Sequence, residues 1–415
     1  MPDKIFFHID VNSAFLSWEA CRRLKSDPES PDLRTIASVV GGSEQTRHGI
    51  VLAKSTPAKK YNIQTGESLM QARKKCPGLI VVPPTFSYYV KMSSLFISLL
   101  KKYAPVVEQY SIDEAFCDMT GTQMLYGPLI QFADRLRNEI NDTLGFTVNI
   151  GISSNKLLAK MASDFKKPNL THTLFPYEIK EKMWPLPVGE LFFVGKATKK
   201  RLANLGIHTI GDIALSDKQL LIDNFKKHGE VIWNYANGLD VEFATNHDAA
   251  NKSYSNITTI QADITDAATA KIIILSLCET VGARMRADKA YISVVSVSIL
   301  TNGFNRFQRQ CTLENPTNVT EIIYQNACRL FDELWDKSPV RQIGISASHA
   351  TDQDYQQLDF FNQQHNEKLS RLNSAIDDIR TRFGEDSVKR ARFINSEHEH
   401  MSGGLNKEKR EHRIR

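Results

Sequence analysis

Two short acidic motifs carry the residue types in this sequence that are best suited to chemistry. Asp10 lies in HIDVNSAF at residues 8–15, and Asp113 and Glu114 lie in YSIDEAF at residues 110–116. In each motif an apolar run leads into the acid, as expected where a buried strand delivers a carboxylate. Three carboxylates brought together in this way would suit phosphoryl transfer, which uses two divalent cations about 4 Å apart.

The role of each acid follows from what the two cations would do. One cation lowers the pKa of an attacking hydroxyl, and the other neutralises a triphosphate and its leaving group. We expect Asp10 and Asp113 to bridge both ions and Glu114 to hold the hydroxyl-activating ion, while the Val11 carbonyl completes the second site. Hard oxygen ligands favour magnesium, so two Mg²⁺ ions are the expected cofactor. A single Asp-Glu pair more often only solvates a turn, and it is the combination of motifs that favours a metal site.

The first 170 residues have the pattern of an α+β domain that would position these acids. Strands are predicted at 5–10, 106–112, 115–118 and 146–153, and helices at 66–76 and 88–103. The acidic pair then lies near a hairpin turn between two strands. The last strand runs into SSNKLLAKMASDF, where Ser153 or Ser154 could cap the next helix. Leu157 and Met161 give that helix an inward-facing apolar side.

A basic helical pattern follows, VGKATKKRLANLGIHTIGDIAL at residues 194–215, and it resembles a helix-hairpin-helix. Gly195 would let the hairpin backbone turn its N–H groups towards a phosphate. Positive charge for contact with a nucleic-acid backbone would come from Lys196, Lys199, Lys200 and Arg201. The alternative is an ordinary helical pair with a solvated basic face.

A second α+β unit follows a polar linker at about residues 240–255. Its elements are predicted as strand 257–264, helix 266–287, strands 291–300 and 304–314, helix 319–335 and strand 340–349. Such a sheet offers a broad face on which a duplex backbone could lie. Positive charge would come from Arg284, Arg286, Arg306, Arg309 and Arg341. A solvated sheet would look similar. The hydrophilic segment 351–415 is expected to form one amphipathic helix before a disordered end.

Composition places the chain among soluble, globular proteins of two to four domains, since 415 residues exceed one compact core. Its hydrophobic fraction is 41%, yet it has no apolar run of about 18 residues that would span a membrane. The amino terminus lacks the pattern of an export signal, so a cytoplasmic location is expected. The six cysteines show no CxxC pair and are interpreted as reduced core residues. The net charge of +5 leans towards a polyanionic partner.

Both acidic motifs, together with GISSNKLLAKMASDFKKPN at residues 151–169, resemble the Y-family translesion DNA polymerases, in the bacterial DNA polymerase IV branch. The resemblance extends over about residues 4–350. It implies an α+β multidomain, right-hand fold with a helical thumb and a β-α-β-β-α-β little finger. The implied domains are a palm at 1–10 and 84–170, fingers at 11–83, a thumb with the helix-hairpin-helix at 171–240, a linker at 241–254, a little finger at 255–350 and a tail at 351–415. Asp10, Asp113 and Glu114 match the metal-binding acids of the family.

The resemblance also implies nucleotide-binding residues. Phe15 occupies the position of the sugar-discriminating ring, where an aromatic side chain leaves no room for a 2′-hydroxyl. Two positions depart from the usual Tyr-x-x-Arg triphosphate motif, because Thr56 and Lys59 stand there; lysine lacks the bidentate fork of arginine. Lys167 matches a second phosphate-binding lysine. Asn12 replaces an acidic residue that is common in the family.

The peptide QLDFF at residues 357–361 looks like a bacterial sliding-clamp-binding motif. Leu358, Phe360 and Phe361 would insert into an apolar groove, and Gln357 would make polar anchoring contacts. An apolar pair of this kind could equally pack against the little finger. Its place in a polar segment after the last predicted domain favours exposure, and hence a clamp partner.

These features predict a template-directed DNA polymerase, acting as a monomer on primer-template DNA and dNTPs. Its short fingers predict an open, low-fidelity site that tolerates damaged templates, and no exonuclease module for proofreading is visible. One alternative is a catalytically silent DNA-binding scaffold recruited by the clamp. A nucleotidyl cyclase with a similar palm is another, but it would not explain the helix-hairpin-helix, the little finger or the clamp peptide.

Overall fold

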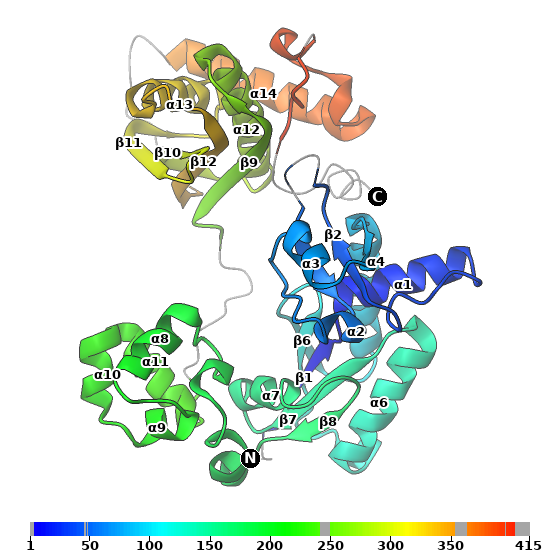
Figure 1. The fold of residues 1–415 in the computed structure, drawn as a ribbon. Coiled ribbons are helices and arrows are strands. Elements are labelled where there is room, and N and C mark those ends of the chain that lie inside the picture. The colour runs from blue at the N-terminus through cyan, green and yellow to red at the C-terminus, as the bar shows by residue number, and fades with distance from the viewer. Residues whose placement is uncertain are drawn as a thin grey trace. The chain divides into compact units, whose positions relative to one another are not determined.

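Two compact units make up the chain in the computed structural model (Figure 1), one formed by residues 1–42 and 50–245 and the other by residues 43–49 and 246–415. The structure describes residues 4–44, 47, 49–240, 250–352, 363–394 and 396–402. Among these residues, no helix combines the length and the apolar character needed to cross a membrane.

A five-stranded sheet organises the first unit, in the order β5-β6-β1-β7-β8. The strands are β1 (Phe6–Val11), β5 (Val106–Gln109), β6 (Glu114–Asp118), β7 (Val148–Ser153) and β8 (Thr171–Thr173). The central strand β1 is antiparallel to both β6 and β7. This arrangement places the first acidic motif, on β1, beside the second, on β6.

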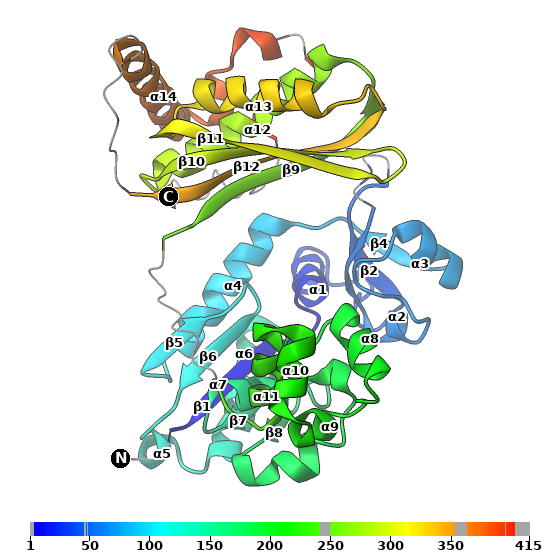
Figure 2. The same ribbon diagram turned by 90° about the vertical axis from the view of Figure 1, so that its left-hand side faces the viewer.

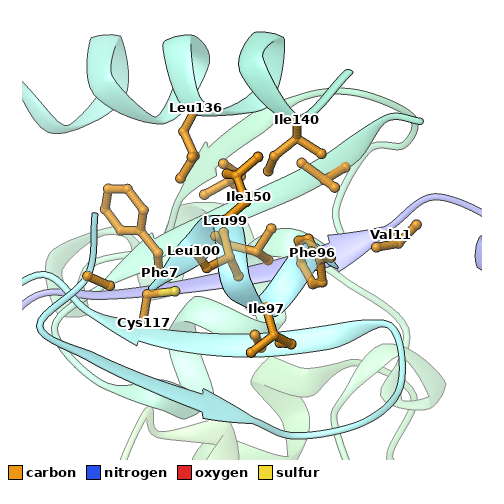
Figure 3. Close-up of a cluster of buried hydrophobic side chains, with 14 of the residues drawn as sticks. Phe7, Val11, Phe96, Ile97, Leu99, Leu100, Cys117, Leu136, Ile140 and Ile150 are labelled. Carbon is orange, nitrogen blue, oxygen red and sulfur yellow. The ribbon is translucent and has the colours of Figure 1, made fainter. Parts of the chain in front are cut away.

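Alternation along β1 divides its side chains between two environments. Phe7, Ile9 and Val11 enter an apolar core, shown in Figure 3, together with side chains of helices α4 (Phe86–Leu100) and α6 (Leu129–Leu144). His8 and Asp10 therefore face the other side of the sheet, because successive strand residues point to opposite faces. The same alternation that buries the core thus presents the acid on the side of α7 (Lys156–Ser163).

Helix α7 packs against β7 and β1 at very short range because Gly151 has no side chain. A Cβ atom at Gly151 would lie 2.0 Å from the Ala159 carbonyl oxygen and 2.4 Å from the Ser163 nitrogen. The cap of α7 is Asn155, whose side chain accepts a hydrogen bond from the Leu158 N–H. The expectation that Ser153 or Ser154 caps this helix was wrong, since β7 continues to residue 153 and the helix begins later.

A smaller sheet, β3-β2-β4, follows the first acidic motif. It consists of β2 (Ser38–Gly41), β3 (Val51–Lys54) and β4 (Ile80–Val82), with helices α1 (Ala14–Ser26), α2 (Thr56–Lys59) and α3 (Leu69–Lys75). The short helix α2 is capped by Ser55, whose side chain accepts a hydrogen bond from the Ala58 N–H. This cap fixes the orientation of the turn that carries Thr56 and Lys59.

Helices complete the first unit after β8. They are η1 (Pro176–Glu178), η2 (Ile179–Met183), η3 (Val188–Glu190), α8 (Lys196–Asn204), α9 (Ile210–Leu215), α10 (Lys218–Phe225) and α11 (Lys227–Ala236). One more short helix, α5 (Gln123–Tyr126), lies earlier in the chain, between β6 and α6. One apolar cluster joins the later helices to Leu157, Leu158 and Met161 of α7. The helical part is therefore packed directly onto the helix that follows β7.

The second unit is built on a four-stranded antiparallel sheet in the order β11-β10-β12-β9. Its elements are β9 (Ser253–Ile264), α12 (Ala267–Ala287), β10 (Tyr291–Thr301), β11 (Arg306–Thr317), α13 (Thr320–Leu334), β12 (Val340–Thr351), α14 (Gln363–Phe383), η4 (Glu385–Ser387) and η5 (Ala391–Phe393). Helices α12 and α13 cover one side of the sheet, as Figure 2 shows. The predicted β-α-β-β-α-β order and the amphipathic helix after it are confirmed, with ends shifted by a few residues.

All six cysteines are unpaired. Cys76, Cys117 and Cys278 are buried, whereas Cys21, Cys311 and Cys328 are only partly buried. The interpretation of all six as core residues was therefore too broad.

Candidate active site

Two of the predicted acids, Asp10 and Glu114, lie on neighbouring strands, and Asp113 immediately precedes the second strand. Asp10 on β1 is directly opposite Glu114 on β6 in the antiparallel register. The Val11 N–H donates a hydrogen bond of 3.0 Å to the Asp113 carbonyl, one residue further along. Directly opposed residues on antiparallel strands have Cβ atoms about 5 Å apart. The backbone therefore brings Asp10, Asp113 and Glu114 to one place.

Lys167 is the cation closest to Asp10. Its Nζ lies 2.5 Å from Asp10 Oδ2 and 2.8 Å from Asp164 Oδ1. Burial raises the pKa of Asp10 to about 7; the charge of Lys167 opposes the rise, and the nearby Glu114 carboxylate adds to it. The ionised form of Asp10 thus lacks sufficient positive charge around it.

For Glu114, nearby positive groups outweigh the effect of burial on the pKa. Its Oε1 lies 3.0 Å from the Lys160 Nζ, and its Oε2 lies 3.7 Å from the His8 Nε2. Burial acts to raise the pKa of Glu114, but His8 and the Lys160 charge together lower it to about 2. The Ser111 hydroxyl donates a 2.7 Å hydrogen bond to Asp113 Oδ1. Each acid therefore has its own polar partner.

This set of donors fits a hard divalent cation. Three carboxylates and the neighbouring Val11 carbonyl supply only oxygen ligands. As they stand, no three His, Cys, Asp or Glu side chains in the described ranges converge closely enough to hold a metal ion. Each carboxylate instead has a separate partner: Lys167 for Asp10, Lys160 for Glu114 and the Ser111 hydroxyl for Asp113. The raised pKa of Asp10 indicates that additional positive charge would be stabilised there.

A cavity of about 450 Å³ opens beside Asp10. Three of the predicted nucleotide-binding residues, Thr56, Lys59 and Lys167, line it together. Arg34 also lines the cavity and was not predicted; its guanidinium is bonded to a neighbouring aspartate and to the Gly145 carbonyl. Hydroxyl and ammonium groups around one cavity suit the oxygens of a polyphosphate.

Phe15 is held in an aromatic cluster at the start of α1. Its ring stacks on Tyr89 with centroids 4.9 Å apart and an interplanar angle of 15°. Phe86 meets it edge-on at 6.0 Å, and Trp18 lies 6.1 Å away. The ring is only partly buried. Packing therefore fixes the plane of this ring without enclosing it.

Asn12, the departure noted in the sequence, ties the end of β1 to the loop that carries Lys167. Its Nδ2 donates to Asn149 Oδ1 at 3.2 Å, and its Oδ1 accepts from the Asn169 N–H at 2.9 Å. Asn149 in turn donates to the carbonyls of Ser163 and Lys166. The amide at position 12 therefore takes part in positioning Lys167.

Lys160 and Asn149 are site residues that the sequence interpretation missed. Both are buried polar side chains, which are common only where they have partners. Lys160 carried a usable signal, because it lies three residues after Leu157 and next to Met161, on the apolar side of the predicted helix. A lone cation in that position indicates a buried ion pair.

The basic residues predicted to contact a nucleic-acid backbone lie on α8, beginning at its first residue. Lys196, Lys199 and Lys200 are exposed, and Arg201 lies over the Phe225 ring at 4.6 Å. Gly195 is the residue before the helix and has φ −83°, so it needs no left-handed backbone; a Cβ there would meet nothing within 4 Å. Gly195 would therefore help phosphate binding by leaving open space at the N-terminus of α8, and not by forming an unusual turn.

The predicted arginines of the second unit do not share one face. Arg306 is exposed on the open face and donates to Gln342. Arg309 points to the helix-covered face, where it pairs with Glu333 of α13 at 2.9 Å. Arg341 stacks on the Phe304 ring at 5.2 Å. Small polar residues instead line the open face, among them Ser255, Ser296, Ser298, Gly344 and Ser346.

Two further arginines on α12 are occupied by protein partners. Arg284 donates to the Ser255 carbonyl and lies 5.8 Å from the Tyr254 ring. Arg286 is bonded to Asp377 of α14 and to the Asn318 carbonyl. Arg286 therefore holds the carboxyl-terminal helix in place. The residues of the predicted clamp-binding peptide, Gln357, Leu358, Phe360 and Phe361, lie outside the described part of the structure.

Family models match three parts of the chain. Residues 9–164 match the impB/mucB/samB family, residues 251–360 match its C-terminal domain, and residues 176–207 match the IMS family HHH motif. The last of these includes residues 194–207 of the segment 194–215 that was interpreted as a helix-hairpin-helix. The three matches follow the order of the elements described above.

Curated proteins and one solved structure extend this similarity to the whole chain. DNA polymerase IV of Clostridium acetobutylicum is 44% identical over 395 residues, which cover 95% of this chain and 99% of that protein. DNA polymerase IV 2 of Bacillus subtilis is 35% identical over 399 residues, covering 94% and 95%. The Y-family DNA polymerase chimera Dbh-Dpo4(243-245)-Dbh has the same fold, with a TM-score of 0.68 at 22% identity over 83% of this chain and 98% of the chimera. The chain belongs to the Y-family DNA polymerases, in the branch whose members are named DNA polymerase IV.

Proposed function

We propose that the chain is a template-directed DNA polymerase that carries out error-prone translesion synthesis without proofreading. It transfers nucleotides from dNTPs to a primer 3′-hydroxyl. The single observation that carries this proposal is that Asp10 lies opposite Glu114 and next to Asp113, beside a cavity lined by Thr56, Lys59 and Lys167. Family membership supports the same activity.

In this proposal, Asp10, Asp113, Glu114 and the Val11 carbonyl would hold two Mg²⁺ ions. The bound ions would supply activation of the primer hydroxyl and charge stabilisation at the triphosphate. The protein positions the reactants, which is the other main source of rate in phosphoryl transfer.

Four side chains would bind the incoming nucleotide. Thr56, Lys59 and Lys167 line the cavity and would contact the triphosphate oxygens. The fixed plane of the Phe15 ring would lie against the sugar and exclude a 2′-hydroxyl. Lys59 supplies a point charge rather than a fork, so we expect the triphosphate to be held less rigidly than by an arginine.

The open site follows from the small elements after the first motif. We assign residues 11–83 to the fingers, residues 1–10 and 84–170 to the palm, and residues 171–240 to the thumb. In the described part of residues 11–83, a three-stranded sheet with helices α1, α2 and α3 is what could press on the nascent base pair. A weak geometric check of this kind favours both misinsertion and tolerance of damaged templates.

DNA and clamp contacts complete the proposal. The exposed start of α8, with Gly195, Lys196 and Lys199, would bind the duplex backbone. In the little finger at residues 255–350, Arg306 is the arginine best placed for DNA on the open face. Residues 357–361 would bind a sliding clamp, and the enzyme would act in the cytoplasm as a monomer.

Primer extension tests the proposed activity directly. Asp113→Ala and Glu114→Ala should abolish extension, whereas Asp118→Asn, an acid at the far end of the same strand, should retain it. Equal extension by the wild type and the two alanine variants would overturn the assignment of the acids. A wild type that binds primer-template DNA but never extends it would favour a catalytically silent scaffold.

A further inference from the structure

Lys160 is a buried cation that the proposed reaction does not use. It lies on α7 with a side chain that is only 9% exposed, and its Nζ is 3.0 Å from Glu114 Oε1. A buried lysine normally has a partner, because an unpaired charge inside a protein is costly. Here the partner is one of the proposed metal-binding acids.

Two aromatic rings from different parts of the first unit flank this ammonium. The Tyr110 ring, next to the second acidic motif, has its centroid 5.7 Å from Lys160 Nζ, and the Phe192 ring has its centroid 5.3 Å away. Both distances are within the range of cation–π attraction. Phe192 also stacks at 16° on Tyr235 of α11, which belongs to the helical part. The lysine is thus held from the palm strand and from the base of the thumb at once.

The surroundings of Lys160 distinguish it from the phosphate-binding lysines. Lys59 and Lys167 line the cavity beside Asp10, whereas Lys160 is directed at Glu114 between the two rings. The ammonium bonded to Glu114 Oε1 fixes the direction of the carboxylate, whose Oε2 faces His8 Nε2 at 3.7 Å.

We propose that Lys160 is a positioning residue: it orients Glu114 for metal binding, and the Phe192 ring couples that orientation to the base of the thumb. This inference rests on the proposed polymerase function. The contacts of Lys160 and Phe192 thus connect the thumb, which is expected to bind the duplex, to Glu114, one of the proposed metal-binding acids. Without its orienting partner, the Glu114 carboxylate keeps its charge but loses its fixed direction. Activity is therefore expected to fall.

Lys160→Met tests the lysine itself, with Lys160→Arg as the conservative variant. In primer extension, Lys160→Met should lower kcat about 10- to 100-fold with an unchanged KM for dNTP, and Lys160→Arg should recover most of the loss. Mn²⁺ binding to a complex with a dideoxy-terminated primer, measured by electron paramagnetic resonance, should weaken in Lys160→Met at an unchanged melting temperature and recover in Lys160→Arg, because the Glu114 carboxylate has lost its orienting partner. A weaker Mn²⁺ affinity together with a lower melting temperature would indicate a merely structural role and overturn the proposal.

Phe192→Leu tests the coupling to the thumb, and Phe193→Leu is its matched control. Phe193 packs on the same Tyr235 ring, at 5.9 Å. Phe192→Leu should lower kcat about threefold to tenfold, the size of a lost cation–π contact, and Phe193→Leu should not. In the Lys160→Met background Phe192→Leu should have no further effect; additive losses would overturn the coupling.

Other outcomes separate this inference from the function beneath it. Wild-type kcat in Lys160→Met, or a raised KM for dNTP with unchanged kcat, would overturn the positioning role while leaving the polymerase assignment intact. A wild-type protein that extends no primer would instead overturn the polymerase function on which the inference rests.

Discussion

Glu279→Gln is expected to loosen the carboxyl-terminal segment from the second unit. Glu279 lies on α12 with a side chain only 3% exposed, and it accepts hydrogen bonds from Arg380 at 2.7 Å and Arg390 at 2.5 Å. Arg380 is itself only 6% exposed. The pair therefore joins a helix of the sheet unit to the segment after residue 363, in an environment with little water.

The size of the effect follows from what remains after the substitution. Removing one partner of a buried ion pair costs about 3–5 kcal/mol, because the other charge stays buried. Arg390 still pairs with Glu321 at 2.6 Å, and Arg380 still donates to the Val388 carbonyl, so each guanidinium retains a partner. We therefore expect a loss at the lower end, about 3 kcal/mol, in the free energy of opening this segment.

Hydrogen exchange followed by mass spectrometry measures this local opening in the full chain. Peptides from α14 should exchange about 100-fold faster in Glu279→Gln, since each factor of ten is about 1.4 kcal/mol. Glu333→Gln is the matched control, because Glu333 is 36% exposed and pairs with Arg309 and Arg329; its change should stay within about 0.5 kcal/mol. Exchange in Glu279→Gln less than fivefold faster than in the wild type would refute the account of the buried pair.

The same pair gives a pH dependence with a definite sign. Burial acts to raise the pKa of Glu279, but Arg390 and Arg380 outweigh it and hold the pKa below the ordinary value of 4.5. The stabilisation is therefore complete above about pH 4.5 and is lost as the pH falls through the folded-state pKa. Glu279→Gln should remove this contribution to the acid sensitivity of α14.

Three further outcomes test the nucleotide and clamp assignments. Phe15→Ala should raise the ratio of ribonucleotide to deoxyribonucleotide incorporation roughly tenfold or more, because the steric wall is gone; an unchanged ratio would contradict the steric role. Thr56→Tyr combined with Lys59→Arg should lower the KM for dNTP about tenfold by restoring a bidentate fork, and a raised KM would count against triphosphate binding at these positions. Deleting residues 357–361 should abolish pull-down of a sliding clamp while primer extension without the clamp persists; retained pull-down would place the contact elsewhere.

The local pattern of the sequence was enough to predict the elements, because apolar alternation and helical spacing are short-range signals. The end of β1 next to Asp10 and the start of β6 at Glu114 follow from the apolar runs beside them, within one residue of the predicted positions. Alternation also held a warning that the sequence interpretation overlooked. Arg306 and Arg309 are three positions apart on one strand, an odd step, so they had to point to opposite faces.

Long-range partners were beyond sequence reasoning. Lys160 meets Glu114 across 46 positions, and Asn149 meets Asn12 across 137, so no local window contains both members of either pair. The docking of the segment after residue 363 through Arg286, Arg380 and Arg390 is equally non-local. Such contacts depend on the register between elements, which the residue types alone leave open.

Gly151 has a consequence for engineering this enzyme. It touches no proposed substrate, yet even a methyl group there would press into the backbone of α7, the helix that delivers Lys160 to Glu114. A library of substitutions at this position, screened for synthesis, should return glycine alone. A design that fixes only the positions near the nucleotide would leave residue 151 free to vary, and the resulting variants would lose activity.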